Sequence, residues 1–556
     1  MVGENNGGKS NIIDAIRLIT APLNGRRERY AEDVDLRHNA SPANFEIVAD
    51  YGELSDTIKG LLISAVPDPT KDQALFGCRY EPQAESGLRG RFTAWAGKFD
   101  STEPEGGSTG LIRHVYLPAL RDAQYALGSA SATRVLALLR HFLPDAEKEQ
   151  FLEAVRRGES TSDVITRMNA DIGTALQELT GGVRPQSAEV NFGNESIQDV
   201  ARDLRFKLGD SGTRLDDIRS SGLGYSNLLY MATVVVELTK ARDADLTLFL
   251  VEEPEAHLHP QLQRLVLEFL LEKATESFEA ERTPGQPEGR IQIVVSTHSP
   301  NLTSWVSPKH LVVIRSCKQD EASSPESACV PIASLGLSDS VLGKINRYLD
   351  VTRSALLFGS RAILVEGIAE ALLLPVIARR FVLQTDQDGM TRFTGTVLLP
   401  IDGVDFLPYL EILLRAHEGT RIADRIVVIT DADPSVPGNR KEDLEAFAAI
   451  QNAADRLWVF TNAITFEHEL FTPANKPILK ATFLALHPRS EARWNSEIES
   501  VSERDQAAAF LTLIVGSKTR KGDFAQELAG RLESESSFDV PTYLREAITK
   551  AAEAWS

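Results

Sequence analysis

A glycine-rich phosphate-binding loop near the start of the chain is the feature that most constrains its fold. Gly3 to Ser10 spells G-E-N-N-G-G-K-S, which matches the motif G-x-x-x-x-G-K-S. In this motif backbone N–H groups surround phosphate oxygens, Lys9 reaches the terminal phosphates, and the Ser10 hydroxyl can ligate magnesium. The motif predicts an α/β nucleotide-binding domain in which Gly3, Asn6, Gly8, Lys9 and Ser10 contact the nucleotide.

Two predicted buried strands carry acidic residues and a histidine that extend this nucleotide site. Residues 246–251 and 291–295 are continuous apolar runs, which are typical of strands covered on both faces. The first run ends at Glu252, placed to hold a magnesium-bound water, and Glu253, placed to polarise the attacking water. His298 follows the second run and is expected to contact the γ-phosphate. A solvated turn and a structural histidine are the alternatives, and the preceding phosphate loop disfavours both.

A segment containing serine and glycine, Ser221-Gly222-Leu223-Gly224, precedes a predicted helix at 227–238. The N-terminus of a helix attracts phosphate, although a glycine pair alone is a weak signal. Taken in order, these elements resemble the ABC ATPases of the chromosome-maintenance and recombination type. In that family Ser221, Gly222 and Gly224 match the signature that completes the ATP site of a partner subunit. The resemblance implies two subunits that enclose two ATP molecules.

Only Met1 and Val2 precede the phosphate loop in this sequence. A phosphate loop of this kind normally leaves the end of a buried strand. We therefore expect the anchoring strand and the opening hairpin of the family to be missing, and ATP binding to be weakened if the truncation is real.

A second acidic cluster follows the nucleotide motifs. Glu366 and Glu370 come after the apolar run 362–365, while Asp431 and Asp433 come after the run 425–429. Carboxylates at the ends of neighbouring strands can converge, and magnesium prefers such hard oxygen ligands. Two ions held in this way can activate a water and stabilise the leaving oxygen of a phosphodiester. A solvated helix face and an ordinary turn are the alternatives for the separate pairs, and their occurrence in one α/β unit favours a metal site.

This arrangement resembles a Toprim domain, the metal-binding fold of topoisomerases, primases and some nucleases. The order of ABC ATPase then Toprim resembles the OLD (overcoming lysogenization defect) family of ATP-dependent endonucleases over nearly the whole chain. The local matches are 117–122, 364–367, 430–433 and 521–525. Lys521 matches the family's lysine near the scissile phosphate, where an ammonium offsets transition-state charge. Glu467 is expected to add a metal ligand.

The resemblance also implies the domain organisation. The ABC ATPase domain is expected at 1–120 and 207–350, interrupted by a helical dimerisation module at 121–206. A C-terminal Toprim α/β domain is expected at 355–556.

Composition restricts the partners and the location. Asp and Glu number 79 against 59 Lys and Arg, a net charge of −20, which argues against broad nonspecific nucleic-acid affinity. Metal cations bound by the protein can reverse the negative electrostatic field locally, so the net charge does not exclude DNA as a partner. No apolar run approaches the roughly 20 residues that cross a bilayer. Three cysteines without metal-ligand spacing indicate reduced thiols and a cytoplasmic protein without membrane contact.

The sequence thus predicts a homodimeric or higher-order enzyme that binds ATP and Mg²⁺, with Mn²⁺ or Ca²⁺ as alternatives at the Toprim site. It is expected to cleave DNA, in anti-phage defence or DNA maintenance, with a helicase or another defence component as a further partner. A noncatalytic nucleotide-gated DNA clamp is the alternative, but it leaves the second acidic cluster unexplained. A topoisomerase is disfavoured because Tyr543 is the one tyrosine after Asp433 and no added domain surrounds it.

Overall fold

The computed structural model of the 556-residue chain forms two compact units. One comprises Met1 and Gly8–Leu302, and the other comprises Val2–Gly7 and Thr303–Ser556. The structure describes all residues except 24, 26, 38–42, 84–89, 120–141, 143–146, 148–149, 151–162, 181–185, 192–204, 211–214, 219–221, 239–240, 242–243, 282–284, 318–325, 433–437, 518 and 555–556.

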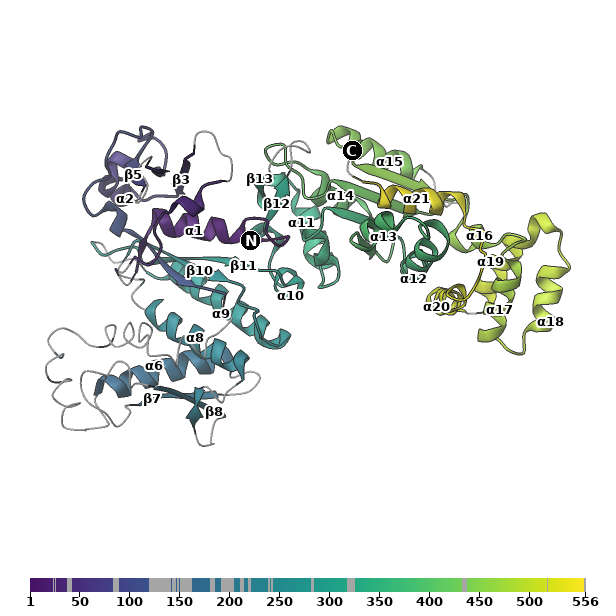
Figure 1. Ribbon diagram of the computed structural model, residues 1–556, viewed down its shortest axis with the longest axis horizontal. Helices are drawn as coiled ribbons and strands as arrows, with labels where there is room; N and C mark the ends of the chain where they lie inside the picture. Colours follow the sequence, from purple (N-terminus) through teal and green to yellow (C-terminus); the bar gives the residue numbers. More distant parts are fainter. Residues whose placement is uncertain are drawn as a thin grey trace. The chain divides into compact units, whose positions relative to one another are not determined.

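A parallel sheet of order β11-β10-β6-β2 is the centre of the first unit (Figure 1). Its strands are β2 (Ala21–Pro22), β6 (Ile112–Leu117), β10 (Leu246–Glu252) and β11 (Arg290–Ser296). Side chains of β10 alternate between two covered faces. Leu248 and Leu250 pack with Ile13, whereas Phe249 and Val251 pack in a different cluster. Helices on both faces explain why β10 is apolar from Leu248 to Val251.

Helix α1 (Lys9–Ile19) covers the face that Leu248 and Leu250 present. The opposite face packs against α6 (Asp163–Thr180), α8 (Leu223–Glu237) and α9 (Pro260–Glu279). Each of these helices contributes buried aliphatic side chains to the same cluster as Phe249. Helices therefore pack on both faces of the sheet in which β10 ends at Glu252 and β11 ends at Ser296, just before His298.

An antiparallel sheet of order β3-β4-β5 also belongs to the first unit. Its strands are β3 (Phe45–Gly52), β4 (Gln73–Glu81) and β5 (Arg91–Ala96), and α2 (Asp56–Leu61) lies between β3 and β4 in sequence. The stretch 81–110 is rich in Gly, Ser and Pro, a composition typical of loops. Strand β5 nevertheless forms within it, because β4 supplies an antiparallel partner from Phe76 to Glu81.

The expected helical module at 121–206 is partly helical in the residues described. Helix α6 confirms a long helix within the predicted helical stretch. After it come β7 (Gln186–Asn191) and β8 (Arg205–Asp210), which pair antiparallel, with β9 (Asp216–Asp217) beside β8. The described part of this segment is therefore mixed α and β rather than all helical.

In the second unit a small sheet has the order β1-β12-β13. Its strands are β1 (Val2–Gly3), β12 (Val312–Cys317) and β13 (Glu326–Pro331). The phosphate loop thus leaves a short strand that pairs parallel with β12, although no such strand was expected. Gly3 has φ of 141°, and a Cβ there would lie 2.2 Å from the carbonyl oxygen of Ile314. Glycine is required at this close approach of two backbones.

A four-stranded parallel sheet of order β15-β14-β16-β17 organises the rest of the second unit. The strands are β14 (Arg361–Val365), β15 (Val397–Pro400), β16 (Arg425–Thr430) and β17 (Leu457–Thr461). Every residue of β14 and β16 is buried. Val365 lies beside Ile429, so the residues that follow these strands emerge at one edge of the sheet.

Helices cover both faces of this sheet and carry several predicted site residues. Ile363 and Ile429 belong to one hydrophobic cluster, whereas Leu364 and Val428 belong to another. The main helices are α11 (Asp339–Tyr348), α12 (Ile368–Ile377), α13 (Gln387–Thr394), α14 (Leu407–Leu414), α15 (Arg440–Ile450), α16 (Phe466–Leu470), α17 (Lys476–Leu486), α19 (Gln506–Gly516), α20 (Lys521–Leu532) and α21 (Thr542–Ala552). Among the helices described, none has the length and apolar character that spanning a bilayer requires.

Candidate functional site

The phosphate loop has the backbone geometry of a turn that opens a helix. Asn6 and Gly8 adopt positive φ angles of 61° and 99°. Glycine adopts this left-handed region without strain, and asparagine tolerates it better than most residues. Gly8 caps α1, and its carbonyl accepts a hydrogen bond from the N–H of Ile12 at 3.1 Å. Lys9 is buried in the first turn. These features are those that the motif predicts for a loop around phosphate.

Glu252 lies at the end of β10 and contacts the start of α1. Its carboxylate forms side-chain hydrogen bonds with Ser10 and Tyr116. Burial raises the pKa of Glu252, and the nearby Asp14 adds to this effect, whereas the two hydrogen bonds oppose it. Ser10 was predicted to ligate magnesium and Glu252 to hold a magnesium-bound water, and the structure brings these two side chains together. Tyr116 was not predicted; it lies beside Leu250 in the sheet, a register that the sequence does not reveal.

Glu253 and His298 also lie close together. Oε1 of Glu253 is 3.5 Å from Nε2 of His298. Glu253 has a positive φ of 44°, a conformation that is uncommon outside glycine and concentrates at functional sites. Oε1 of Glu255 accepts hydrogen bonds from Thr297 Oγ1 at 2.7 Å and from the N–H of His298 at 2.8 Å. Glu255, which sequence reasoning did not single out, therefore fixes the backbone that presents His298.

The predicted signature segment begins helix α8. Ser221 lies outside the described residues. Gly222 caps the helix in an extended conformation. A Cβ on Gly224 would lie 2.7 Å from the carbonyl oxygen of His257, so the helix approaches the segment after Glu253 as closely as glycine permits. Asn227 Nδ2 reinforces this contact by donating to the carbonyl oxygen of Ala256 at 2.9 Å.

The second acidic cluster lies where β14 and β16 end. Glu366 follows β14, and its Oε1 accepts hydrogen bonds from the Thr430 hydroxyl and from the N–H of Asp431 at 2.8 Å. The structure thus joins Glu366 to the segment that carries Asp431. Asp433 lies outside the described residues.

Glu370 and Asp431 titrate well above their ordinary values. Burial raises the pKa of Glu370 from 4.5 to about 8, and the charges of Asp431, Glu467 and Glu366 contribute. Burial likewise raises the pKa of Asp431 from 3.8 to about 6, with Glu366 and Glu467 adding to it and Asn462 opposing it. Carboxylates whose pKa values are perturbed by burial and by neighbouring charges are typical of functional sites. The charges of Glu366 and Glu467 thus contribute to the raised pKa of both Glu370 and Asp431.

The donor chemistry fits a divalent cation. Glu370 and Asp431 are carboxylates without an ion pair among the described residues, and such hard oxygens suit magnesium. In the described part of the chain, however, no three acidic, histidine or cysteine side chains converge closely enough to form a ready-made metal cluster. The complete ligand set therefore stays a prediction.

Lys521 begins α20 and reaches this carboxylate group. Its Nζ lies 3.0 Å from Oε2 of Glu467, which is almost fully buried in α16. Burial lowers the pKa of Lys521, but the charge and hydrogen bond of Glu467 outweigh that effect, so the pKa is raised overall. Lys521 is therefore protonated at neutral pH, as its predicted role requires.

Two side chains that sequence reasoning missed also hold the segment after β16. Asn462 follows β17, donates to Oδ1 of Asp431, and accepts from the N–H of Ala432 at 3.2 Å. Arg440, at the start of α15, donates to Oε1 of Glu366 at 2.8 Å. The position of Asn462 directly after a strand of the same sheet is a signal that could have identified it.

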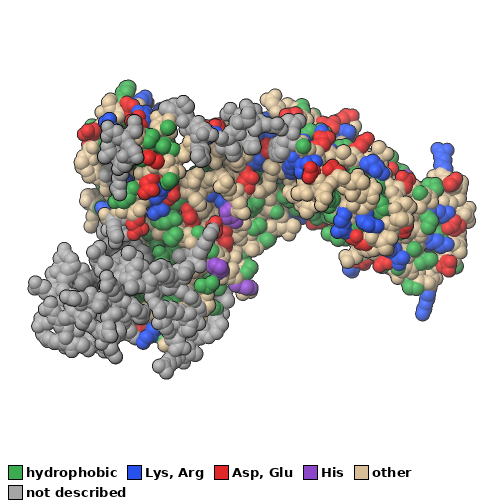
Figure 2. All heavy atoms as spheres, viewed as in Figure 1, with side chains coloured by type: hydrophobic (Ala, Val, Ile, Leu, Met, Phe, Trp, Pro, Cys, Tyr) green, Lys and Arg blue, Asp and Glu red, His purple; other side chains and the backbone are tan. Residues whose placement is uncertain are grey.

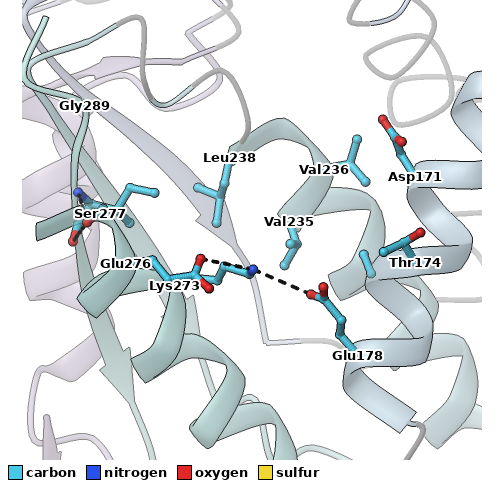
Figure 3. A pocket seen from close by; sticks show the side chains of 12 residues that line it. Asp171, Thr174, Glu178, Val235, Val236, Leu238, Lys273, Glu276, Ser277 and Gly289 are labelled. Carbon is cyan, nitrogen blue, oxygen red and sulfur yellow. Dashed lines mark hydrogen bonds and ion pairs between the residues drawn. The ribbon is translucent and has the colours of Figure 1, made fainter. Parts of the chain in front are cut away.

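A separate pocket of about 510 Å³ lies in the first unit (Figure 3). Helices α6, α8 and α9 contribute to its lining, and Lys273 forms ion pairs there with Glu178 at 3.7 Å and Glu276 at 3.3 Å. None of the predicted site residues lines this pocket.

Comparisons with known proteins identify two domains. Residues 115–303 match the family model of an AAA ATPase domain, which includes Glu252, Glu253 and His298. Residues 357–433 match the model described as overcoming lysogenization defect protein-like, TOPRIM domain, which includes Glu366, Glu370 and both aspartates.

Curated relatives and a solved structure carry the same family name. The Old nuclease of Escherichia phage P2 is 23% identical over 68% of this chain and 66% of its own length. The OLD nuclease of Thermus scotoductus is 24% identical over 66% of this chain and 67% of its own length. The chain thus spans about two thirds of both relatives. The C-terminal region of the Burkholderia pseudomallei OLD protein is 23% identical, covers 35% of this chain and 98% of that structure, and has a TM-score of 0.26. The resemblance predicted from the sequence is confirmed: the chain combines an AAA ATPase domain with an OLD-like TOPRIM domain.

Proposed function

We propose that this protein is an ATP-dependent, metal-dependent DNA endonuclease of the OLD type. The observation that supports the proposal is that Glu366 and Asp431 follow neighbouring parallel strands at one edge of the TOPRIM sheet, where Glu366 accepts a hydrogen bond from the N–H of Asp431. A chain that only bound and hydrolysed nucleotide would have no use for a second set of buried carboxylates. Buried carboxylates with raised pKa values are destabilising when ionised, and a bound cation compensates for this.

The TOPRIM residues have separate roles in this proposal. Glu366, Glu370, Asp431 and Asp433 would hold divalent cations, which activate water and stabilise the leaving oxygen when bound. Magnesium is the proposed ion, with manganese or calcium as alternatives. Lys521 supplies an ammonium that offsets charge on the scissile phosphate. Its ion pair with Glu467 holds that ammonium beside the carboxylate group.

The ATPase residues divide between binding and hydrolysis. Lys9 would bind phosphate, Ser10 would ligate magnesium, and Glu252 would hold a water of that ion. Glu253 polarises the attacking water, and the adjacent His298 contacts the γ-phosphate. Gly222 and Gly224, with Ser221, complete the site of a second copy, so a homodimer encloses two ATP molecules. The segment 121–206 serves dimerisation.

DNA is the proposed substrate, and its binding is local. Basic and acidic side chains are intermixed on the face seen in Figure 2, in line with the net charge of −20. Broad nonspecific attraction to phosphates requires a cationic surface. Cations held by the carboxylates, together with Lys521, reverse the local field where the scissile phosphate binds.

The two alternative functions receive less support. A DNA clamp without catalysis gives no role to Glu370 or Asp431. A topoisomerase needs an accessible tyrosine nucleophile, whereas Tyr543 is buried in a hydrophobic cluster and burial raises its pKa well above the ordinary value. We place the nuclease in anti-phage defence or DNA maintenance, with a helicase or another defence component as a partner. The cysteines Cys78, Cys317 and Cys329 form no disulfide, which suits the reducing cytoplasm.

A plasmid cleavage assay tests the proposal. Wild-type protein should nick or linearise plasmid DNA with magnesium or manganese. The same assay with and without ATP measures whether ATP activates or inhibits cleavage. Replacing Asp431 and Asp433 by alanine should abolish cleavage and leave ATP hydrolysis intact. Asp443→Ala, an exposed aspartate of α15, is the matched control and should cleave normally. Persistent cutting by the double variant would refute the metal assignment.

A further inference from the structure

One carboxylate oxygen of Glu366 is already fully engaged by protein donors. Oε1 accepts hydrogen bonds from the Thr430 hydroxyl, from the N–H of Asp431 at 2.8 Å, and from Nη1 of Arg440 at 2.8 Å. Three donors leave this oxygen little capacity for another partner. Among the described residues nothing donates to Oε2, so this is the oxygen that remains for an external ligand.

Arg440 contributes more than one contact to this arrangement. Its Nη1 also donates to the Thr430 hydroxyl and, at 3.0 Å, to the carbonyl oxygen of Asp431. The guanidinium therefore connects Glu366, which follows β14, to Thr430, the last residue of β16, and to Asp431, which follows it. The Arg440 and Glu366 side chains are only 21% and 19% exposed, so their ion pair is partly shielded from water.

The pairing of charges around the carboxylates is not uniform. Glu366 has Arg440 as a partner, and Glu467 has Lys521 at 3.0 Å. Glu370 and Asp431 form no ion pair among the described residues. Protein cations thus offset the charge of Glu366 and Glu467, whereas Glu370 and Asp431 have no such partner in the described part of the chain.

From these contacts we propose that Arg440 is a positioning residue for the metal centre. It holds Glu366 so that Oε1 stays bound to the protein and Oε2 alone is presented to the cation. This inference rests on the proposed function, because it assigns a role within the same site. Residues that orient metal ligands in this way typically contribute 10- to 100-fold to metal affinity or activity.

Direct measurement of Mn²⁺ binding, without nucleotide or DNA, tests the role of Arg440. Calorimetric titration with Mn²⁺ compares the wild type with Asp431→Asn, and the difference between their binding is the part that depends on the TOPRIM site. Arg440→Gln removes the positive charge and the Nη1 donor, and Thr430→Val removes the hydroxyl that also donates to Oε1 of Glu366. Lys441→Gln is the matched control, because Lys441 is the next residue of α15 and its ion pair in the described part of the chain is with Glu445, at 3.8 Å. Circular dichroism in EDTA verifies that each variant folds.

We expect the Asp431-dependent Mn²⁺ affinity to fall about 10-fold in Arg440→Gln, in line with the loss of an orienting partner. Thr430→Val should weaken it in the same direction, and the double variant should lose less than the sum because both act through one oxygen. Lys441→Gln should bind as wild type does.

The outcomes separate the two proposals. Unchanged affinity in Arg440→Gln overturns the positioning role and leaves the nuclease proposal intact. Tighter binding also overturns it, because the guanidinium would then compete with the cation. Absence of Asp431-dependent binding in the wild type overturns both. A folded Arg440→Gln with weakened binding, beside an unaffected Lys441→Gln, supports the inference.

Discussion

The ammonium nitrogen of Lys521 lies 3.0 Å from Oε2 of Glu467, and the two residues begin separate helices 54 positions apart in the chain. Glu467 is 4% exposed, whereas half of the Lys521 side chain faces solvent. A buried carboxylate therefore anchors an accessible cation. Glu467 was predicted as a metal ligand, and its contact with Lys521 adds a second role, which is to hold the ammonium beside Asp431 and Glu370.

Replacing Lys521 by glutamine should lower the rate of DNA cleavage by about 10²–10³-fold, the usual effect of removing one group that stabilises transition-state charge. ATP hydrolysis should be unaffected. Single-turnover plasmid cleavage with saturating magnesium measures the effect. Lys480→Gln is the charge-matched control, since Lys480 is partly exposed and lies 3.9 Å from Glu499, which is not one of the predicted site residues. An equal loss in both variants would mean that only general DNA attraction had changed.

The positions of Glu366 and Asp431 could be predicted because the local sequence shows where each strand ends. A continuous apolar run indicates a buried strand, and the carboxyl ends of neighbouring parallel strands lie at the same edge of the sheet. The pairing of Val365 with Ile429 confirms that reasoning. The same logic could have extended to Asn462, which follows the next strand of the sheet.

The contacts of Arg440 and Tyr116 could not be predicted in this way. Arg440 reaches Glu366 from the start of a helix, and no periodicity reveals where a helix begins relative to a sheet edge. Tyr116 reaches Glu252 through the register of β6 against β10, which depends on tertiary packing. Strands β5, β7 and β8 were missed because pairing with an antiparallel neighbour, rather than their own pattern, defines them.

Replacing Glu253 by glutamine should reduce ATP turnover by about 10²–10³-fold while ATP still binds, because an amide cannot polarise water as a carboxylate does. The bound ATP should then persist and hold two copies together. Turnover assays and size-exclusion chromatography with ATP measure both effects. Glu272→Gln, on the exposed side of α9, is the control. Unaltered turnover in Glu253→Gln would remove this residue as the base.

Without metal, the protein should lose stability as pH rises from 6 to 8, because folding raises the pKa of Glu370 from 4.5 to about 8. The folded state then binds the proton that the unfolded state has released, so this stabilising effect is complete below pH 4.5 and disappears above pH 8. Asp431, with a pKa of about 6, contributes mainly below this window. Glu370→Gln should flatten the dependence, which amounts to a few kcal/mol at most.

Thermal unfolding in EDTA at pH 6, 7 and 8 measures this dependence. The exposed Asp388→Asn serves as the control and should follow the wild type. Saturating magnesium should restore stability at pH 8, since a cation that binds the ionised carboxylates stabilises the folded state. A wild-type profile that stays flat in EDTA would contradict the buried, protonated Glu370.

Replacing Arg315 by glutamine should destabilise the second unit far more than replacing Arg379 by glutamine. Arg315 is 5% exposed, and its guanidinium donates to Asp424 and to the carbonyl oxygen of Ile422, which ties β12 to the start of β16. Breaking a buried pair costs about 3–5 kcal/mol, and the retained contact of Asp424 with Arg456 at 2.7 Å should keep the loss near the lower end. Arg379 pairs with Glu533 at the surface, where such a pair contributes about 0–1 kcal/mol. Thermal unfolding and limited proteolysis of both variants measure the difference. Equal midpoints would show that the contact between Arg315 and Asp424 does not stabilise this junction.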